Sequence, residues 1–202
     1  MRNSLTIICL LGSVGVARAE PTAPQPWSVG VAPRVGVSIA TSKLGPFVIG
    51  GLQVDVATPI AAHRLLVGVD LSVTRPSYDA SAMDPRIPSG AGMYTIKETE
   101  LVVGLVATYR LSSGERSFVP WVGGGPVLHM LKTNETTTLA PGDNTATSTE
   151  LGVEVFGGAD LRVGKGFLVG DLRLVYSKLD HPLTGSTNAG KVGIAVGYRF
   201  VF

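Results

Sequence analysis

Hydrophobic residues alternate with small or polar residues along most of this chain. In the last segment, residues 191–202, every second position is apolar or aromatic, and the positions between carry lysine, glycine, alanine and arginine. A period of two residues indicates β-strands with one apolar and one small or polar face. The same pattern predicts eight strands, over residues 27–40, 47–56, 65–74, 95–110, 118–132, 150–163, 167–178 and 191–202.

The connections between these segments differ in length. The second, fourth and sixth, at residues 57–64, 111–117 and 164–166, are short, and the last of them predicts a tight hairpin. Residues 75–94 and 133–149 read as long polar loops, residues 179–190 as intermediate, and residues 41–46 as short. An even number of roughly ten-residue strands with short turns on one side is typical of a small membrane barrel. We therefore predict an all-β fold, an eight-stranded antiparallel up-and-down transmembrane β-barrel, over residues 27–202.

The first residues carry an export signal. Arg2 precedes an apolar stretch too short to span a bilayer, and Ala17-Arg18-Ala19 fits a cleavage site. We predict a signal peptide over residues 1–19 and a proline-rich lead-in over residues 20–26. The single cysteine, Cys9, lies inside the signal, so the mature chain contains no thiol.

Composition narrows the class. Without Arg2 and Arg18, the 17 basic residues become 15, which balance 15 acidic ones. This neutral charge gives no support for nucleic-acid binding. Mean hydropathy is +0.31, yet no stretch after the signal reaches the 18 apolar residues of a membrane helix. Lipid admits only helices and closed barrels, so the alternation favours a barrel.

Two motifs resemble those of the small outer-membrane barrels of diderm bacteria, the OmpA-like, OmpX-like and OmpW-like group. The end of the chain, Gly197-Tyr-Arg-Phe-Val-Phe202, is similar to the Gly-x-x-aromatic-x-aromatic signal of that group, although Ala195 replaces the usual polar residue. Pro120-Trp-Val-Gly-Gly-Gly resembles a glycine-rich strand of the same group. The resemblance implies an outer-membrane location, contact with membrane lipid and lipopolysaccharide, and a monomer. It also implies that the barrel assembly machinery reads the signal residues, which are Gly197, Tyr198, Phe200 and Phe202.

The polar faces of the strands would converge on the lumen. Since buried charges must pair, we predict an interior ion-pair network. Asp160 with Arg162, and Asp171 with Arg173, share a face within their strands. The predicted network comprises Arg34, Asp55, Asp70, Glu100, Arg110, Glu154, Asp160, Arg162, Asp171, Arg173 and Arg199. An eight-stranded lumen is just wide enough for side chains to fill, so a plug is expected; a narrow gated path for ions or small solutes is the alternative.

The leading functional interpretation is a non-enzymatic barrel that serves envelope integrity, surface interaction or limited solute passage. A soluble lipocalin-like carrier is an alternative, in which apolar faces would point inward. A lipid A-modifying enzyme is a further one, although His129 is not followed by the serine of a deacylase-type His-x-Ser pattern. We expect no catalytic residues, metal or cofactor.

Overall fold

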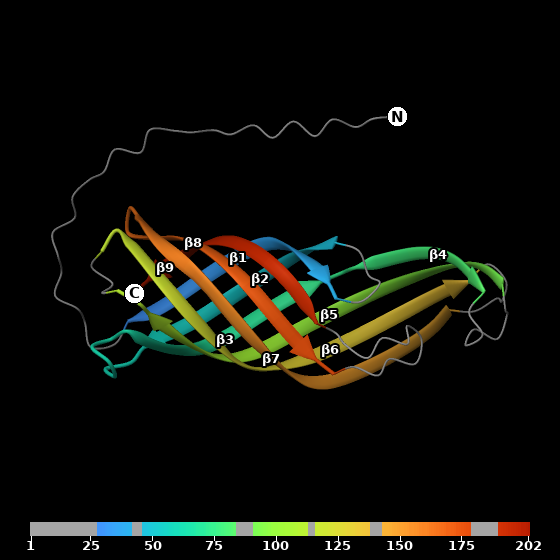
Figure 1. Ribbon diagram of the computed structural model, residues 1–202, viewed down its shortest axis with the longest axis horizontal. Helices are drawn as coiled ribbons and strands as arrows, with labels where there is room; N and C mark the ends of the chain where they lie inside the picture. The colour runs from blue at the N-terminus through green and yellow to red at the C-terminus, as the bar shows by residue number, and fades with distance from the viewer. Residues whose placement is uncertain (1–27, 42–45, 84–90, 113–115, 138–142, 179–189) are drawn as a thin grey trace, which may run out of the picture.

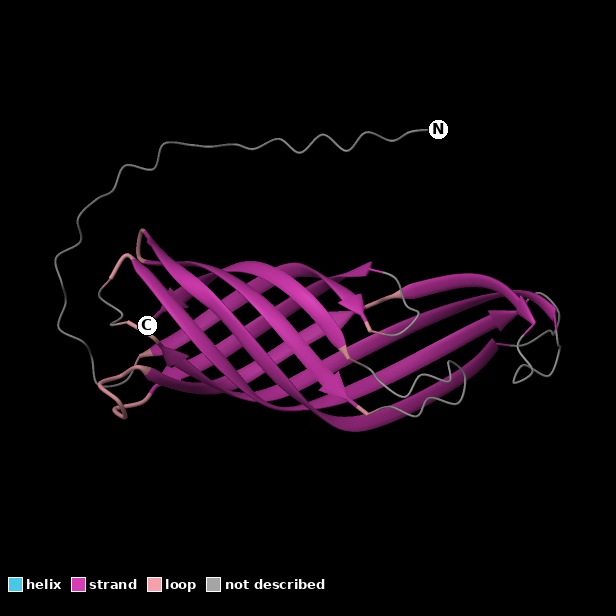
Figure 2. Cartoon of the chain, viewed as in Figure 1, coloured by secondary structure: helices cyan, strands magenta, loops and turns pink. Residues whose placement is uncertain are grey.

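Antiparallel strands wrap around one axis into a closed barrel (Figures 1 and 2). The computed structural model describes residues 28–41, 46–83, 91–112, 116–137, 143–178 and 190–202. No helix within these ranges could cross a bilayer. The strands of the described residues are β1 (Val29–Ala40), β2 (Pro46–Ala57), β3 (Leu65–Thr74), β4 (Ser77–Met83), β5 (Ala91–Arg110), β6 (Phe118–Thr137), β7 (Asp143–Val163), β8 (Gly166–Ser177) and β9 (Lys191–Val201).

The barrel closes through the pairing of the first and last strands. β1 pairs with both β2 and β9, and Val29 exchanges backbone hydrogen bonds with Phe202 at 3.0 and 3.1 Å. On the other side, β3 pairs with β5. β4 follows β3 after a two-residue break and continues along the same edge of β5. The nine segments therefore occupy eight positions around the barrel, which confirms the predicted fold class.

Apolar side chains cover the outside of this barrel. Leu151, Val155 and Ile194 are 71%, 60% and 57% exposed, whereas Asp70, Glu154 and Asp171 on the intervening positions are buried. The predicted faces are confirmed in the seven segments for which the alternation is clear, and β6, where prolines and glycines obscure it, buries Trp121 and His129 on its inner face. The lipocalin-like alternative requires the opposite polarity and is wrong for the described strands.

Four strands extend beyond the others at one end of the barrel. Figure 1 shows β4 and the ends of β5, β6 and β7 projecting past β1, β2, β8 and β9. Residues 75–94 and 133–149 were expected to be loops, but parts of both are paired strands: Met83 faces Ala91, and Thr136 faces Asp143. The prediction failed because these strands lack a continuous apolar face, although Thr and Tyr favour strands. We call this the extended end.

The opposite end carries tight connections and is called the turn end. Gly164 and Lys165 alone join β7 to β8, and Gly164 has a φ of 61°, so the predicted hairpin is confirmed. Between β2 and β3, Ala61, Ala62 and His63 have φ values of 53°, 55° and 63°, a left-handed conformation unusual for residues with a β-carbon. The predicted signal peptide and lead-in, residues 1–19 and 20–26, lie outside the described residues.

Candidate functional site in the lumen

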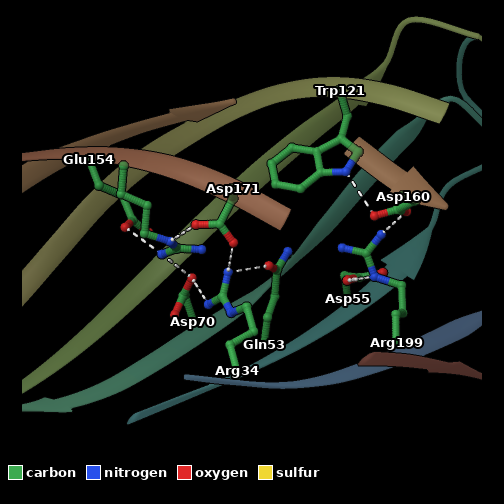
Figure 3. Close-up of polar contacts among 10 residues, drawn as sticks. Arg34, Gln53, Asp55, Asp70, Trp121, Glu154, Asp160, Asp171 and Arg199 are labelled. Carbon is green, nitrogen blue, oxygen red and sulfur yellow. Dashed lines mark hydrogen bonds and ion pairs between the residues drawn. The ribbon is translucent and has the colours of Figure 1, made fainter. Parts of the chain in front are cut away.

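The middle of the lumen is crossed by a network of ion pairs (Figure 3). Arg34 reaches from β1 to Asp70 on β3 at 2.6 Å, to Asp171 on β8 at 3.3 Å and to Gln53 on β2 at 3.0 Å. The strands that surround the axis are thus joined by side chains as well as by backbone ladders. We call this group, with Arg173 and Glu154, the middle cluster.

Arg173 is the second cation of the middle cluster. Its Nη1 lies 2.5 Å from Asp70 and 3.0 Å from Glu154, and its Nε donates to Asp171 at 2.9 Å. Two guanidinium groups are therefore shared among three carboxylates. Hydrogen bonds donated by a guanidinium group are charge-assisted and roughly twice as strong as those between neutral groups.

A second group of ion pairs lies nearer the turn end. Arg199 on β9 is paired with Asp160 on β7, and its Nε is 3.4 Å from Asp55 on β2. Arg110 lies 3.7 Å from Asp160, and the Trp121 indole donates to the same carboxylate at 2.8 Å. This turn-end cluster contains two cations, Arg110 and Arg199, and two acids, Asp55 and Asp160. Figure 3 shows Arg199 and both acids beside Trp121.

An aromatic layer lies against both groups of charges. Trp121 and Phe156 are 1% and 2% exposed, and their rings meet edge to face with centroids 5.7 Å apart. Val106 and Val169 complete this apolar cluster. On one side, the Arg173 guanidinium carbon of the middle cluster is 4.9 Å from the centre of the Phe156 ring. On the other side, the Trp121 indole donates its hydrogen bond to Asp160 of the turn-end cluster. The lumen therefore contains a packed hydrophobic layer as well as ion pairs.

A third polar group lies nearer the extended end. Glu100 on β5 is 2.6 Å from His129 Nδ1 and 2.6 Å from Lys191 Nζ, and it accepts a hydrogen bond from Thr74 at 3.0 Å. His129 is completely buried. Within the described residues, no three His, Cys, Asp or Glu side chains form a group suited to bind a metal ion.

A small cavity separates this group from the middle cluster. It measures about 30 Å³, and Arg34, Glu154, Arg173 and Lys191 contribute to its lining. Gly51 and Gly193 form part of its wall, so their missing side chains help to leave the space. Glu154 Oε1 and Arg173 Nη2 are buried without a hydrogen-bond partner. A cavity of this size has room for about one water.

The structure places ten of the eleven predicted network residues inside the lumen, in the three groups described above. The eleventh, Arg162, is exposed at the turn end, and its guanidinium carbon lies 5.1 Å from the centre of the Phe167 ring. Arg162 therefore lies on the same face of β7 as Asp160, opposite the buried Phe167, but it is not enclosed among the three groups. Because β7 ends at Val163, Arg162 lies past the enclosed part of the lumen.

Sequence reasoning missed two participants: His129 was not assigned to the network, and Trp121 was not placed inside the barrel. Lys191 was expected on a polar face that points into the lumen, but it was not named in the network. Trp121 and His129 are eight residues apart in β6 and so share a face. That spacing was a usable signal, but the prolines and glycines of residues 120–126 hide the alternation.

The terminal motif lies on the barrel wall. Tyr198 donates to the Val163 carbonyl at 2.8 Å and stacks edge to face with Phe200 at 4.9 Å. Phe200 and Phe202 are 47% and 74% exposed on the outer surface. Gly197 pairs with Arg34 on β1 and with Val169 on β8. Aromatic side chains at the end of a transmembrane strand are typical of the membrane–water interface.

Comparison with known proteins identifies the fold. The chain is similar to a major outer membrane protein from Thermus thermophilus, with a TM-score of 0.56, 16% identity, and coverage of 86% of this chain and 99% of that one. It is also similar to the attachment invasion locus protein Ail of Yersinia pestis, solved with the heparin analogue sucrose octasulfate, with a TM-score of 0.50, 14% identity, and coverage of 87% and 100%. No family model matches the sequence, and no curated protein matches it.

Proposed function

We propose that the protein is an integral outer-membrane barrel with a closed lumen, whose extended end presents a sheet of strands to the surroundings. The apolar outer surface supports membrane insertion, because a soluble protein rarely exposes such a continuous apolar surface. The short turns would face the periplasm and the extended end the exterior, which is the usual arrangement in this type of barrel.

The observation that carries the closed lumen is the aromatic layer between two charged groups. An ion following the axis would have to leave the paired charges of one cluster, pass Trp121 and Phe156, and enter the other cluster. Removing an ion from water without pairing it is costly, and a dry apolar layer offers no partner. The protein would then act by presenting its surface and strengthening the envelope rather than by passing solutes.

The extended sheet supports a role in surface interaction. β4 pairs only with β5 among the described strands, and the first part of β7 pairs only with β6. No strand of the described residues pairs with the two outer edges of this sheet, which supports strand addition by a binding partner. Exposed threonines such as Thr145 and Thr147 make its outer face polar.

Current through planar lipid bilayers tests the closed lumen. Refolded wild-type protein is expected to leave the bilayer at its baseline conductance. The double variant Trp121→Ala/Phe156→Ala is expected to give discrete openings, because it removes both large rings of the apolar layer. The matched control is Phe118→Ala, which removes an exposed aromatic ring from the outer surface.

The outcome that rejects the closed lumen is reproducible wild-type conductance that changes in Arg173→Ala. Such a result would place a conducting path through the middle cluster and favour limited solute passage.

The position of His129 does not favour a lipid-modifying enzyme. Its ring lies inside the lumen and contacts Glu100, whereas lipid lies against the outer face. Mass spectrometry of lipid A from cells that express the protein tests this point. Unchanged masses are expected, and a new deacylated or acylated species would show that the protein is an enzyme.

A further inference from the structure

Three basic side chains gather on the outer face of the barrel near the extended end. Thr99 on β5 pairs with Lys132 on β6. Arg75 lies on the other side of Thr99. The residues on either side of Arg75 show this, because Thr74 pairs with Glu100 and the Pro76 carbonyl accepts a hydrogen bond from the Glu98 amide. Lys97 is two residues further along β5. The side chains of Arg75, Lys97, Lys132 and Thr99 are exposed. We call these three cations and the threonine between them the basic row.

The spacing within the basic row suits a phosphate group. Adjacent strands are about 4.8 Å apart, so Arg75 and Lys132 are separated by roughly 10 Å with Thr99 between them. Lys97 lies about 7 Å from Thr99 along its strand. Long flexible cations on three sides can therefore converge above one hydroxyl group. Guanidinium and ammonium groups both form charge-assisted hydrogen bonds with phosphate oxygens.

The basic row begins where the apolar surface ends. Val73 precedes Arg75 by two residues and is 44% exposed, and Leu101 follows Thr99 by two residues and is 37% exposed. Both point outward on the same face as the row. A molecule that carries acyl chains next to a phosphate would contact both the basic row and the adjoining apolar surface. A free phosphate ion would contact only the basic row.

Among the described side chains of these strands, one exposed acid, Asp79 on β4, lies on the same face. It pairs with Thr95, from which it accepts a hydrogen bond at 2.7 Å, and it lies four residues, about 13 Å, beyond Arg75. Asp79 therefore lies next to Lys97 at the outer end of the basic row, whereas Arg75, Thr99 and Lys132 lie at the boundary with the apolar surface. The charge at that boundary is therefore positive on these strands.

We propose that the basic row binds a phosphate group of a lipid in the outer leaflet, with the acyl chains of that lipid lying along the aliphatic rows of β3, β5 and β6. This inference rests on the orientation given under the proposed function. Each cation near an anionic lipid surface contributes roughly fivefold to affinity, so removing three is expected to weaken binding about a hundredfold.

Calorimetric titration in detergent micelles tests this site. The probe is bisphosphorylated lipid A, and the variant is Arg75→Gln/Lys97→Gln/Lys132→Gln. The wild type is expected to bind about a hundredfold more tightly than the variant. Lipid A without phosphates should bind both proteins equally weakly. Heat-modifiable gel mobility and insertion into vesicles are measured first for each protein, so that failure of the barrel to insert is distinguished from loss of the lipid site.

A matched pair of single variants separates the site from general charge: Lys132→Gln removes a cation of the basic row, and Lys178→Gln is the control. Lys178 is also exposed near the extended end, but it follows β8 and lies outside the basic row. Lys132→Gln is expected to cost about fivefold and Lys178→Gln less than about twofold. Equal losses in the two variants would show diffuse attraction and overturn the site. Inorganic phosphate that binds as tightly as the lipid, and is lost in the triple variant, would overturn the assignment to a lipid.

Discussion

At the scale of single residues, the sequence predicts which side chains point inward but not which of them meet. Alternation along each strand places Arg34, Asp70 and Asp171 in the lumen. Their pairing depends on the offset between strands that are distant in sequence, such as β1 and β8, and no local pattern records this offset. Arg162 is a different case. The alternation places it correctly on the inner face of β7, but it lies beyond the enclosed part of the lumen and so does not join the three groups.

Arg199→Met is expected to destabilise the barrel by about 3–5 kcal/mol, because it leaves Asp55 and Asp160 buried without their principal cation. Urea unfolding in lipid vesicles, followed by tryptophan fluorescence, measures the effect. Arg116→Met removes an exposed cation at the same end and should cost less than about 0.5 kcal/mol. Equal stability of the two variants would mean that the turn-end cluster does not stabilise the fold.

A substitution in the left-handed turn between β2 and β3 is expected to stabilise the protein. Ala61 has a φ of 53°, where a β-carbon costs roughly 1 kcal/mol and glycine costs almost nothing. Ala61→Gly is therefore expected to raise the free energy of unfolding by up to about 1 kcal/mol. The control is Ala159→Gly within β7, which should lower it by roughly 0.5–1 kcal/mol. If Ala61→Gly destabilises as much as the control does, the turn is not strained.

At the scale of elements, strands that cross the membrane could be predicted from the sequence better than strands outside it. Strands that cross lipid need one apolar face, so residues such as those of β3 and β8 alternate clearly and could be predicted. β4 and the outer parts of β6 and β7 lack a continuous row of apolar residues in the sequence, yet they keep their backbone ladders. Their pairing depends on the neighbouring strands, which a reading of single segments does not include.

The packing of β6 against β7 depends on glycine at several places, and Gly158 is one of them. A β-carbon added at Gly158 would collide with the Gly170 carbonyl oxygen and lie 2.8 Å from two atoms of the Trp121 ring, whereas one added at Gly170 would meet nothing within 4 Å. Gly158→Ala is therefore expected to destabilise by about 1–3 kcal/mol through overpacking. Gly170→Ala, in the neighbouring strand, should be neutral or slightly stabilising. Urea midpoints compare the two, and a similar effect of both changes would contradict the close packing around Gly158.

At the scale of the whole molecule, three requirements are met together. Pairing of β1 with β9 closes the part of the barrel that crosses the membrane, apolar side chains cover its outside, and the arginines inside are paired with acids. The first two could be predicted, since lipid excludes unpaired backbone and exposed charge. The aromatic layer could not, because Trp121 and Phe156 come from strands whose inner faces mix glycine with apolar residues.

Quenching of tryptophan fluorescence by brominated lipids tests the orientation of the two faces most directly. In a Trp27→Phe background, Trp121 alone reports the lumen, and a second protein in the same background with Trp121→Phe and Val155→Trp reports the outer surface. The account predicts strong quenching of the outer tryptophan, which is in contact with lipid, and little quenching of Trp121, which is 1% exposed inside the barrel. Strong quenching of Trp121 together with a protected residue 155 would contradict the account.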